Sequence, residues 1–170
     1  KNLDLSSLKE DTRQDDYLLI GDASINFITE RTTWACLMVD RACNSELIFG
    51  MENQKNDIHA AELLPYVKAM QALRHRHKQI GRYKLRLHII CDNSNVVAQY
   101  GKTAGFHTSG IWKEVLSYEV SHFDLYFEHA LRRSNPLMKL VDSVCSALQN
   151  THGELDDKVQ SVCHRYSSAI

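Results

Sequence analysis

The stretch from Leu85 to Ser94 constrains the fold more than any other part of the sequence. An apolar run over residues 85–90 alternates in part with polar residues and is typical of a buried strand. Asp92 comes directly after this strand, and Asn93 and Ser94 are residue types that cap helices. We therefore expect a carboxylate at a strand end beside a helix N-terminus. In α/β sheets this edge collects ligands and catalytic groups.

Composition sets the outer limits. The chain has 170 residues, of which 44% are hydrophobic and 24% charged, as in an ordinary globular domain. A formal net charge of −1 neither favours nor excludes nucleic acid, because a local basic surface decides that. Five cysteines without C-x-x-C spacing indicate reduced thiols in an intracellular protein of the cytoplasm or nucleus. No apolar run approaches the ~20 residues of a membrane span, so no membrane partner is predicted.

Three strands are expected before the first helix. Apolar runs at residues 17–20, 32–39 and 46–51 are joined by short connectors, which predicts an antiparallel meander. The first run leads into Gly21 and Asp22. Asp22 is thus expected in the middle of the sheet, with Gly21 permitting close approach of another backbone.

Helical periodicity follows from about residue 57, with Pro65 inside the pattern. The helix either starts near Ala61 or kinks at Pro65, and in both cases Glu62 lies near its first turn. The basic run over residues 74–78 ends this helix. Favourable charge at a helix C-terminus explains the run better than a nucleic-acid contact does, although the second interpretation stays open.

Further elements follow Asp92. We expect a helix to about residue 100, another beginning at 111–116, a half-exposed strand over 122–127 and a final helix. Pro136 lies just inside that helix, with Ser134 or Asn135 as its cap. Residues 17–150 thus form one domain, preceded by a linker or arm at 1–16 and followed by a helix or tail at 151–170. Because the chain starts with Lys1 rather than Met, we expect it to be part of a larger polypeptide.

The chain resembles the ribonuclease H-like superfamily, and most closely its ribonuclease H type. The motifs that carry the resemblance are Gly21-Asp22-Ala23-Ser24, Thr33-Trp34-Ala35, His59-Ala60-Ala61-Glu62-Leu63, Cys91-Asp92-Asn93-Ser94 and His129-Ala130-Leu131-Arg132-Arg133-Ser134-Asn135. The resemblance covers about residues 17–148. It implies an α/β fold with a mixed five-stranded sheet, three antiparallel strands and then two parallel ones, flanked by helices.

Phosphodiester hydrolysis requires an activated water and neutralised charge on the phosphate. Two Mg²⁺ ions roughly 4 Å apart supply both, and such hard ions take carboxylate oxygens. Asp22, Glu62 and Asp92 can form that cluster. The resemblance implies that Asp22 bridges two Mg²⁺ or Mn²⁺ ions, that Glu62 and Asp92 complete one site, and that Asp142 belongs to the other. It also implies a proton shuttle at His129.

The resemblance implies an RNA:DNA hybrid as substrate, recognised by its shape and its 2′-hydroxyls. The expected nucleic-acid contacts are Ser24, Asn93, Ser94, Trp112, Lys113, Arg132, Arg133 and Asn135.

The chain departs from the ribonuclease H pattern at Lys139, where the last acid belongs, and it lacks the usual glycine after Asp22. An alternative function is therefore a non-catalytic or weakly active nucleic-acid-binding module of a larger polymerase or mobile-element protein. Plainer interpretations also exist for single residues. Strand-end acids often only form turns or caps, Asp142 fits a solvated helix face, and His129 fits a backbone hydrogen bond.

Overall fold

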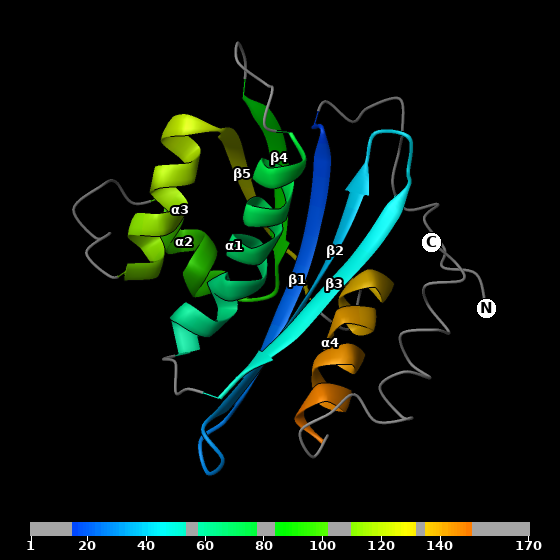
Figure 1. Cartoon of the computed structure of the whole chain (residues 1–170), viewed down its shortest axis with the longest axis vertical. Coiled ribbons are helices and arrows are strands. Elements are labelled where there is room, and N and C mark those ends of the chain that lie inside the picture. The colour runs from blue at the N-terminus through cyan, green and yellow to red at the C-terminus, as the bar shows by residue number, and fades with distance from the viewer. Residues whose placement is uncertain (1–14, 54–57, 78–83, 102–109, 132–134, 151–170) are drawn as a thin grey trace.

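A computed structural model describes residues 15–53, 58–77, 84–101, 110–131 and 135–150. Five strands and four helices make up this part of the chain (Figure 1). In chain order they are β1 (Tyr17–Asn26), β2 (Arg31–Asp40), β3 (Ser45–Glu52), α1 (Ile58–Arg76), β4 (Leu85–Cys91), α2 (Ser94–Gly101), α3 (Gly110–Ser121), β5 (Phe123–His129) and α4 (Pro136–Gln149).

The strands form one mixed sheet in the order β3-β2-β1-β4-β5. The first three strands pair antiparallel, and β4 and β5 join them in parallel with β1. The expected α/β fold with three antiparallel strands followed by two parallel ones is therefore confirmed. β1 is the central strand, and its residues 17–20 pair with β2 on one side and β4 on the other.

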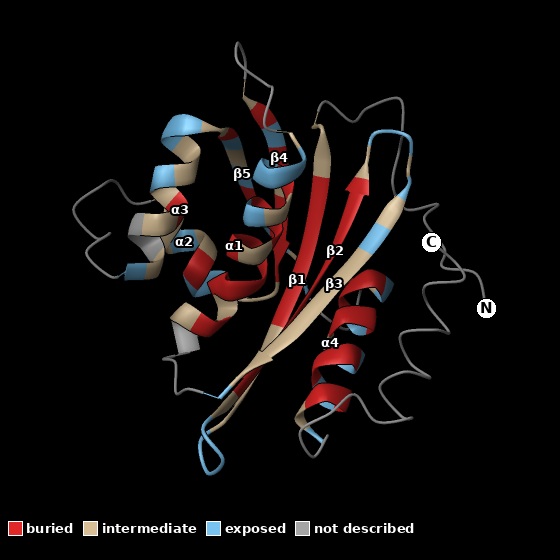
Figure 2. Cartoon of the chain, viewed as in Figure 1, coloured by how far each residue is buried: buried red, intermediate tan, exposed pale blue. Residues whose placement is uncertain are grey.

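Helices cover both faces of the sheet (Figure 1). On one face, α1, α2 and α3 enclose a core that includes Leu19, Met70 and Phe123. On the other face, α4 packs its apolar stripe, as predicted, against side chains of β1 and β2 such as Ile20 and Leu37. Buried residues accordingly line β1, β2 and the sheet-facing sides of α1 and α4 (Figure 2). Burial of these side chains stabilises the sheet from both faces.

β1 continues through Asp22 to Asn26, so Asp22 lies within the sheet as expected, and the antiparallel pairing of β1 with β2 outlasts its parallel pairing with β4. The first helix differs from one of its two expected forms. The prediction that this helix starts near Ala61 was wrong, because α1 begins at Ile58 and contains Pro65. An interior proline removes one helical hydrogen bond. Pro65 lies close to Gly21 of β1, so the helix packs on the strand at this point.

Side-chain caps begin two helices where the sequence predicted them. The amide oxygen of Asn93 accepts hydrogen bonds from the backbone N–H groups of Asn95 and Val96 at the start of α2. Asn135, rather than Ser134, caps α4, and Pro136 is its first residue. A capping oxygen satisfies N–H groups that have no partner within the helix.

The four cysteines that the structure describes are free thiols, which agrees with the prediction of reduced cysteines. None of the described helices is long and apolar enough to cross a membrane. The expected tail over 151–170 and almost all of the expected arm over 1–16 lie outside the described residues. The proposed domain limits of 17 and 150 therefore stay a prediction.

Candidate metal centre

Two aspartates lie where the neighbouring strands β1 and β4 stop pairing, Asp22 within β1 and Asp92 directly after β4. The last pair in the parallel register of β1 and β4 is Ile20 with Ile90. Asp22 and Asp92 each follow two residues later. The parallel register ends at this pair, so both aspartates lie just beyond it, at the same end of the paired segment.

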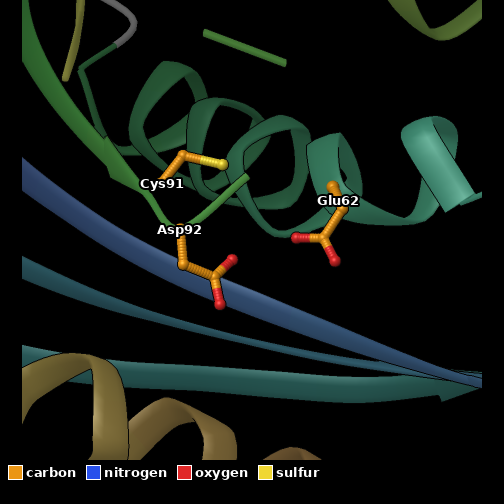
Figure 3. Close-up of side chains that lie close together, drawn as sticks. All are labelled: Glu62, Cys91 and Asp92. Carbon is orange, nitrogen blue, oxygen red and sulfur yellow. The ribbon is translucent and has the colours of Figure 1, made fainter. Parts of the chain in front are cut away.

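Glu62 reaches the same end of β4 from α1 (Figure 3). A carboxylate oxygen of Glu62, a carboxylate oxygen of Asp92 and the sulfur of Cys91 all lie within 4.8 Å of one another. Both acids are half-buried and Cys91 is buried. Figure 3 shows the carboxylate groups of Glu62 and Asp92 facing each other, Glu62 from α1 and Asp92 from the end of β4. We call these three residues the edge cluster.

The edge cluster suits a hard divalent cation. Mg²⁺ binds oxygen ligands at about 2.0–2.1 Å and keeps several of its waters, so two carboxylates at this separation fit its needs. Cys91 contributes differently. Burial, the largest effect, raises the pKa of the Cys91 thiol to about 12, while the backbone at Asn93 lowers it and the charge of Glu62 raises it. At neutral pH Cys91 is therefore a neutral thiol, which leaves Glu62 and Asp92 as the oxygen ligands.

Asp22 approaches this edge from the other side of the sheet. Its neighbour Gly21 faces α1, whereas Leu18 and Ile20 face α4. Strand alternation thus directs the Asp22 side chain to the α4 face. Only 1% of Asp22 is exposed, and its backbone carbonyl accepts a hydrogen bond from the Cys145 thiol at 3.2 Å. A carboxylate buried to this extent requires compensating hydrogen bonds or positive charge.

Asp142 lies on α4, three residues before Cys145, and is half-buried beside the apolar stripe of the helix. α4 therefore places Asp142 on the same face of the sheet as Asp22. Neither of these acids belongs to the edge cluster. Lys139 is exposed one turn before Asp142. Of the four predicted ligands, Glu62 and Asp92 converge within the dimensions of one ion, and Asp22 and Asp142 come from the opposite face.

His129 ends β5 beside the edge cluster. Its position pairs with Cys91 in the parallel register, and its Nε2 atom lies 3.1 Å from the backbone carbonyl oxygen of Asp92. The imidazole is exposed. The predicted backbone hydrogen bond of this histidine is thus present, and it holds the ring next to a predicted metal ligand.

The residues predicted to contact nucleic acid are only partly described. Ser94 is exposed at the start of α2, whereas Asn93 and Asn135 use their amide oxygens as helix caps. Ser24 is half-buried on β1, and its carbonyl accepts a hydrogen bond from Gln149. The side chains of Trp112 and Lys113, and both Arg132 and Arg133, lie outside the described residues.

Sequence reasoning missed Tyr66, which joins the elements that carry the site. Its hydroxyl donates to the carbonyl of Ile90 at 2.6 Å and accepts from the N–H of Gly21 at 3.3 Å. Tyr66 is fully buried, and this burial keeps its pKa well above the usual range, so the hydroxyl retains its proton. The phenol therefore connects α1 to β1 and β4 directly before Asp22 and Cys91. In the sequence it is one more apolar residue of a helical pattern.

No protein-family model and no curated protein sequence matches the chain. Solved structures do match. LC11-RNase H1 in complex with an RNA/DNA hybrid has a TM-score of 0.57 at 11% identity, over 74% of this chain and 92% of that chain. The N-terminal RNase H domain of a Mycobacterium tuberculosis protein, solved as a fusion with maltose-binding protein, has a TM-score of 0.58 at 9% identity, over 85% and 96%.

A further structure of LC11-RNase H1, isolated from compost by a metagenomic approach, has a TM-score of 0.54 at 13% identity, over 75% and 93% of the two chains. Each match extends over nearly the whole of the solved domain, although few residues are identical. The order and direction of the strands are as the motifs predicted. The chain therefore has a ribonuclease H-like fold.

Proposed function

We propose that the chain is a metal-dependent nuclease that hydrolyses the RNA strand of RNA:DNA hybrids by a two-metal mechanism. The observation that carries this proposal is the meeting of Glu62 and Asp92 within 4.8 Å, at the end of β4 where its pairing with the Asp22-bearing strand β1 stops. Acids that are 30 positions apart in the sequence are brought together there by a ribonuclease H-like fold. Carboxylates that converge in this way are what Mg²⁺ or Mn²⁺ requires.

Each residue has a proposed task. Glu62 and Asp92 would hold one ion, Asp22 would be a ligand shared with a second ion, and Asp142 is the candidate ligand on the α4 side. When bound, the ions activate water and neutralise charge on the phosphate. His129 is exposed beside Asp92, where it can take up and release a proton during turnover. The buried Tyr66 hydroxyl keeps α1 and β4 at the spacing that the ligands need.

The proposed substrate is an RNA:DNA hybrid, bound mainly through its phosphates and 2′-hydroxyls. One neighbour in fold was solved with an RNA/DNA hybrid, which supports this choice of substrate for testing. Ser94 is exposed at the start of α2 next to the edge cluster, and a phosphate there would meet the positive end of the helix.

A cleavage assay tests the proposal. A hybrid labelled on the RNA strand is incubated with the protein and either Mg²⁺ or Mn²⁺, and the products are separated by length. We expect internal cuts that Asp92→Asn and Glu62→Gln each reduce at least a hundredfold. Asp124→Asn is the matched control, because Asp124 is exposed at the other end of the parallel strands. The nuclease proposal is wrong if the wild-type protein leaves the hybrid intact with both metals.

A second candidate function is a binding module without cleavage. Lys139 favours it, because an ammonium stands where the ribonuclease H pattern has its last acid, one turn from Asp142 on an exposed part of α4. A binding module would retain hybrid affinity in the absence of divalent metal and yield no cuts with it. Measuring hybrid binding with EDTA alongside the cleavage assay separates the two functions.

A further inference from the structure

A surface hollow lies between the second half of α1 and the end of α3. Its volume is about 520 Å³, and it is lined by Gln71, Arg74, His75, Tyr118 and His122. The backbone of His122 accepts a hydrogen bond from Leu85, the first residue of β4. The edge cluster lies beyond the other end of the same seven-residue strand, about 20 Å away at the usual rise per residue. We call this hollow the α1/α3 hollow.

Among the residues that the structure describes, none of those lining the α1/α3 hollow is acidic. The lining combines a guanidinium, two imidazoles, an amide and a phenol. The two acids of α3, Glu114 and Glu119, form hydrogen bonds with other side chains. Glu114 accepts a hydrogen bond from Gln71 at 3.0 Å, and Glu119 is bonded to the Tyr100 hydroxyl. The hollow therefore offers hydrogen-bond donors and positive charge.

Arg74 lies over an aromatic ring. Its guanidinium carbon lies 5.8 Å from the centre of the Tyr118 ring. In the part of the chain that the structure describes, no carboxylate forms an ion pair with Arg74, whereas the neighbouring Arg76 binds Glu46 at 2.7 Å. A guanidinium in cation–π contact with a ring keeps the N–H groups at its edge for a planar or tetrahedral anion. Arg74 is thus poised for an external anion.

We propose that the α1/α3 hollow binds a backbone phosphate of nucleic acid, with Arg74 as the main ligand and His75 and His122 as further donors. The choice of nucleic acid as the source of the phosphate rests on the proposed function; the anion site itself rests on the lining residues. Arg74 is twelve residues beyond Glu62 on α1, which is about 18 Å along the helix. One strand would need about five nucleotides to reach both places.

The proposal is tested by direct binding without metal. The affinity of the full chain for a labelled RNA:DNA hybrid is measured by fluorescence anisotropy in EDTA over a series of salt concentrations. We expect Arg74→Gln to weaken binding at least fivefold and to reduce the slope of log K against log salt by about 0.7–0.9, as loss of one phosphate contact requires. Tyr118→Phe, which keeps the ring, should bind within twofold of wild type.

Arg41→Gln is the matched control, because Arg41 has a 60% exposed side chain at the β2–β3 turn and loses the same charge. Equal effects of Arg41→Gln and Arg74→Gln would overturn the proposal, since only net charge would then matter. An unchanged slope for Arg74→Gln would also overturn it. Circular dichroism establishes that each variant is folded before its binding is compared.

Inorganic phosphate distinguishes the source of the anion. Displacement of the hybrid by millimolar phosphate in the wild type but not in Arg74→Gln would support a phosphate-binding hollow. Cleavage is read separately. Hybrid binding that depends on Arg74 in a protein that does not cut would sustain this site while the nuclease proposal fails. If Asp92→Asn abolishes cutting and Arg74→Gln binds the hybrid as wild type does, the nuclease proposal stands and the phosphate site in the hollow is wrong.

Discussion

Tyr66 and Gly21 are in direct contact across the interface between α1 and β1. The Tyr66 hydroxyl oxygen lies 3.3 Å from the Gly21 nitrogen. A β-carbon placed on Gly21 would lie 3.1 Å from the Tyr66 ring and 2.7 Å from the β-carbon of Pro65. The helix that carries Glu62 thus sits on β1 at a distance that only glycine allows. Gly21 immediately precedes Asp22, so this contact also fixes the spacing of two predicted ligands.

Gly21→Ala is expected to destabilise the fold. The added methyl group would force α1 away from β1, and overpacking of this kind costs about 1–3 kcal/mol. Urea unfolding measures the free energy directly. Gly110→Ala is the control, because a β-carbon at Gly110 meets no atom within 4 Å. Equal stabilities for the two variants would contradict the close contact.

Tyr66→Phe is expected to cost about 1–3 kcal/mol of unfolding free energy, because it leaves the buried carbonyl of Ile90 without its 2.6 Å donor. Thermal or urea unfolding checks this value. The matched variant Tyr126→Phe removes a hydroxyl from a residue that is 64% exposed, and its effect should stay within about 0.5 kcal/mol. A Tyr66→Phe protein as stable as Tyr126→Phe would mean that the hydroxyl does not hold α1 to the sheet.

Local patterns predicted most of the fold because each pattern reflects one dominant force. On β5, Phe123 and Phe127 are buried and Asp124, Tyr126 and Glu128 are exposed, as alternation required. The strand end at Asp92 and the close approach at Gly21 were also predicted from local chemistry. Strand and cap preferences depend on a few neighbouring residues, so they can be recognised from the sequence alone.

The composition of the site could be predicted only in part, because side-chain direction depends on packing between distant elements. Cys91 directly follows the apolar run of a predicted strand, but nothing local indicated that its sulfur lies within 4.8 Å of Glu62 and Asp92. The role of Tyr66 depends on carbonyl and amide groups 24 and 45 positions away in the chain. Pro65 argued against an interior helical position, and a tertiary contact outweighed that local preference.

Stability should fall at alkaline pH because of Cys91. Burial raises the pKa of this thiol from 9.0 to about 12. Between these values the unfolded chain loses the proton and the folded chain retains it. The thiol's contribution is therefore complete below pH 9 and is lost as pH rises toward 12, at up to about 1.4 kcal/mol per pH unit.

The free energy of unfolding of Cys91→Ala, measured by urea titration from pH 9 to 11, should show a correspondingly shallower pH dependence than that of wild type. Val96→Ala truncates a buried side chain of the same core cluster and keeps the thiol, so it should follow the wild-type slope. Coincident slopes for Cys91→Ala and wild type would show that the thiol ionises as easily in the folded chain as in the unfolded one.

Replacing Lys139 by an acid should strengthen metal binding at the proposed nuclease site. Lys139 is exposed on α4, one turn before Asp142, on the side of the sheet from which Asp22 approaches the edge. Lys139→Asp exchanges an ammonium for a possible oxygen ligand. We expect the Mn²⁺ concentration for half-maximal hybrid cleavage to fall about tenfold, because substitutions beside metal ligands typically change metal affinity by about 10–100-fold. Ser146→Asp adds an acid to the same exposed face two turns further on, and it should leave this concentration within twofold of wild type. If both variants respond alike, Lys139 belongs to an ordinary solvated face of α4, and its charge then has no part in limiting cleavage.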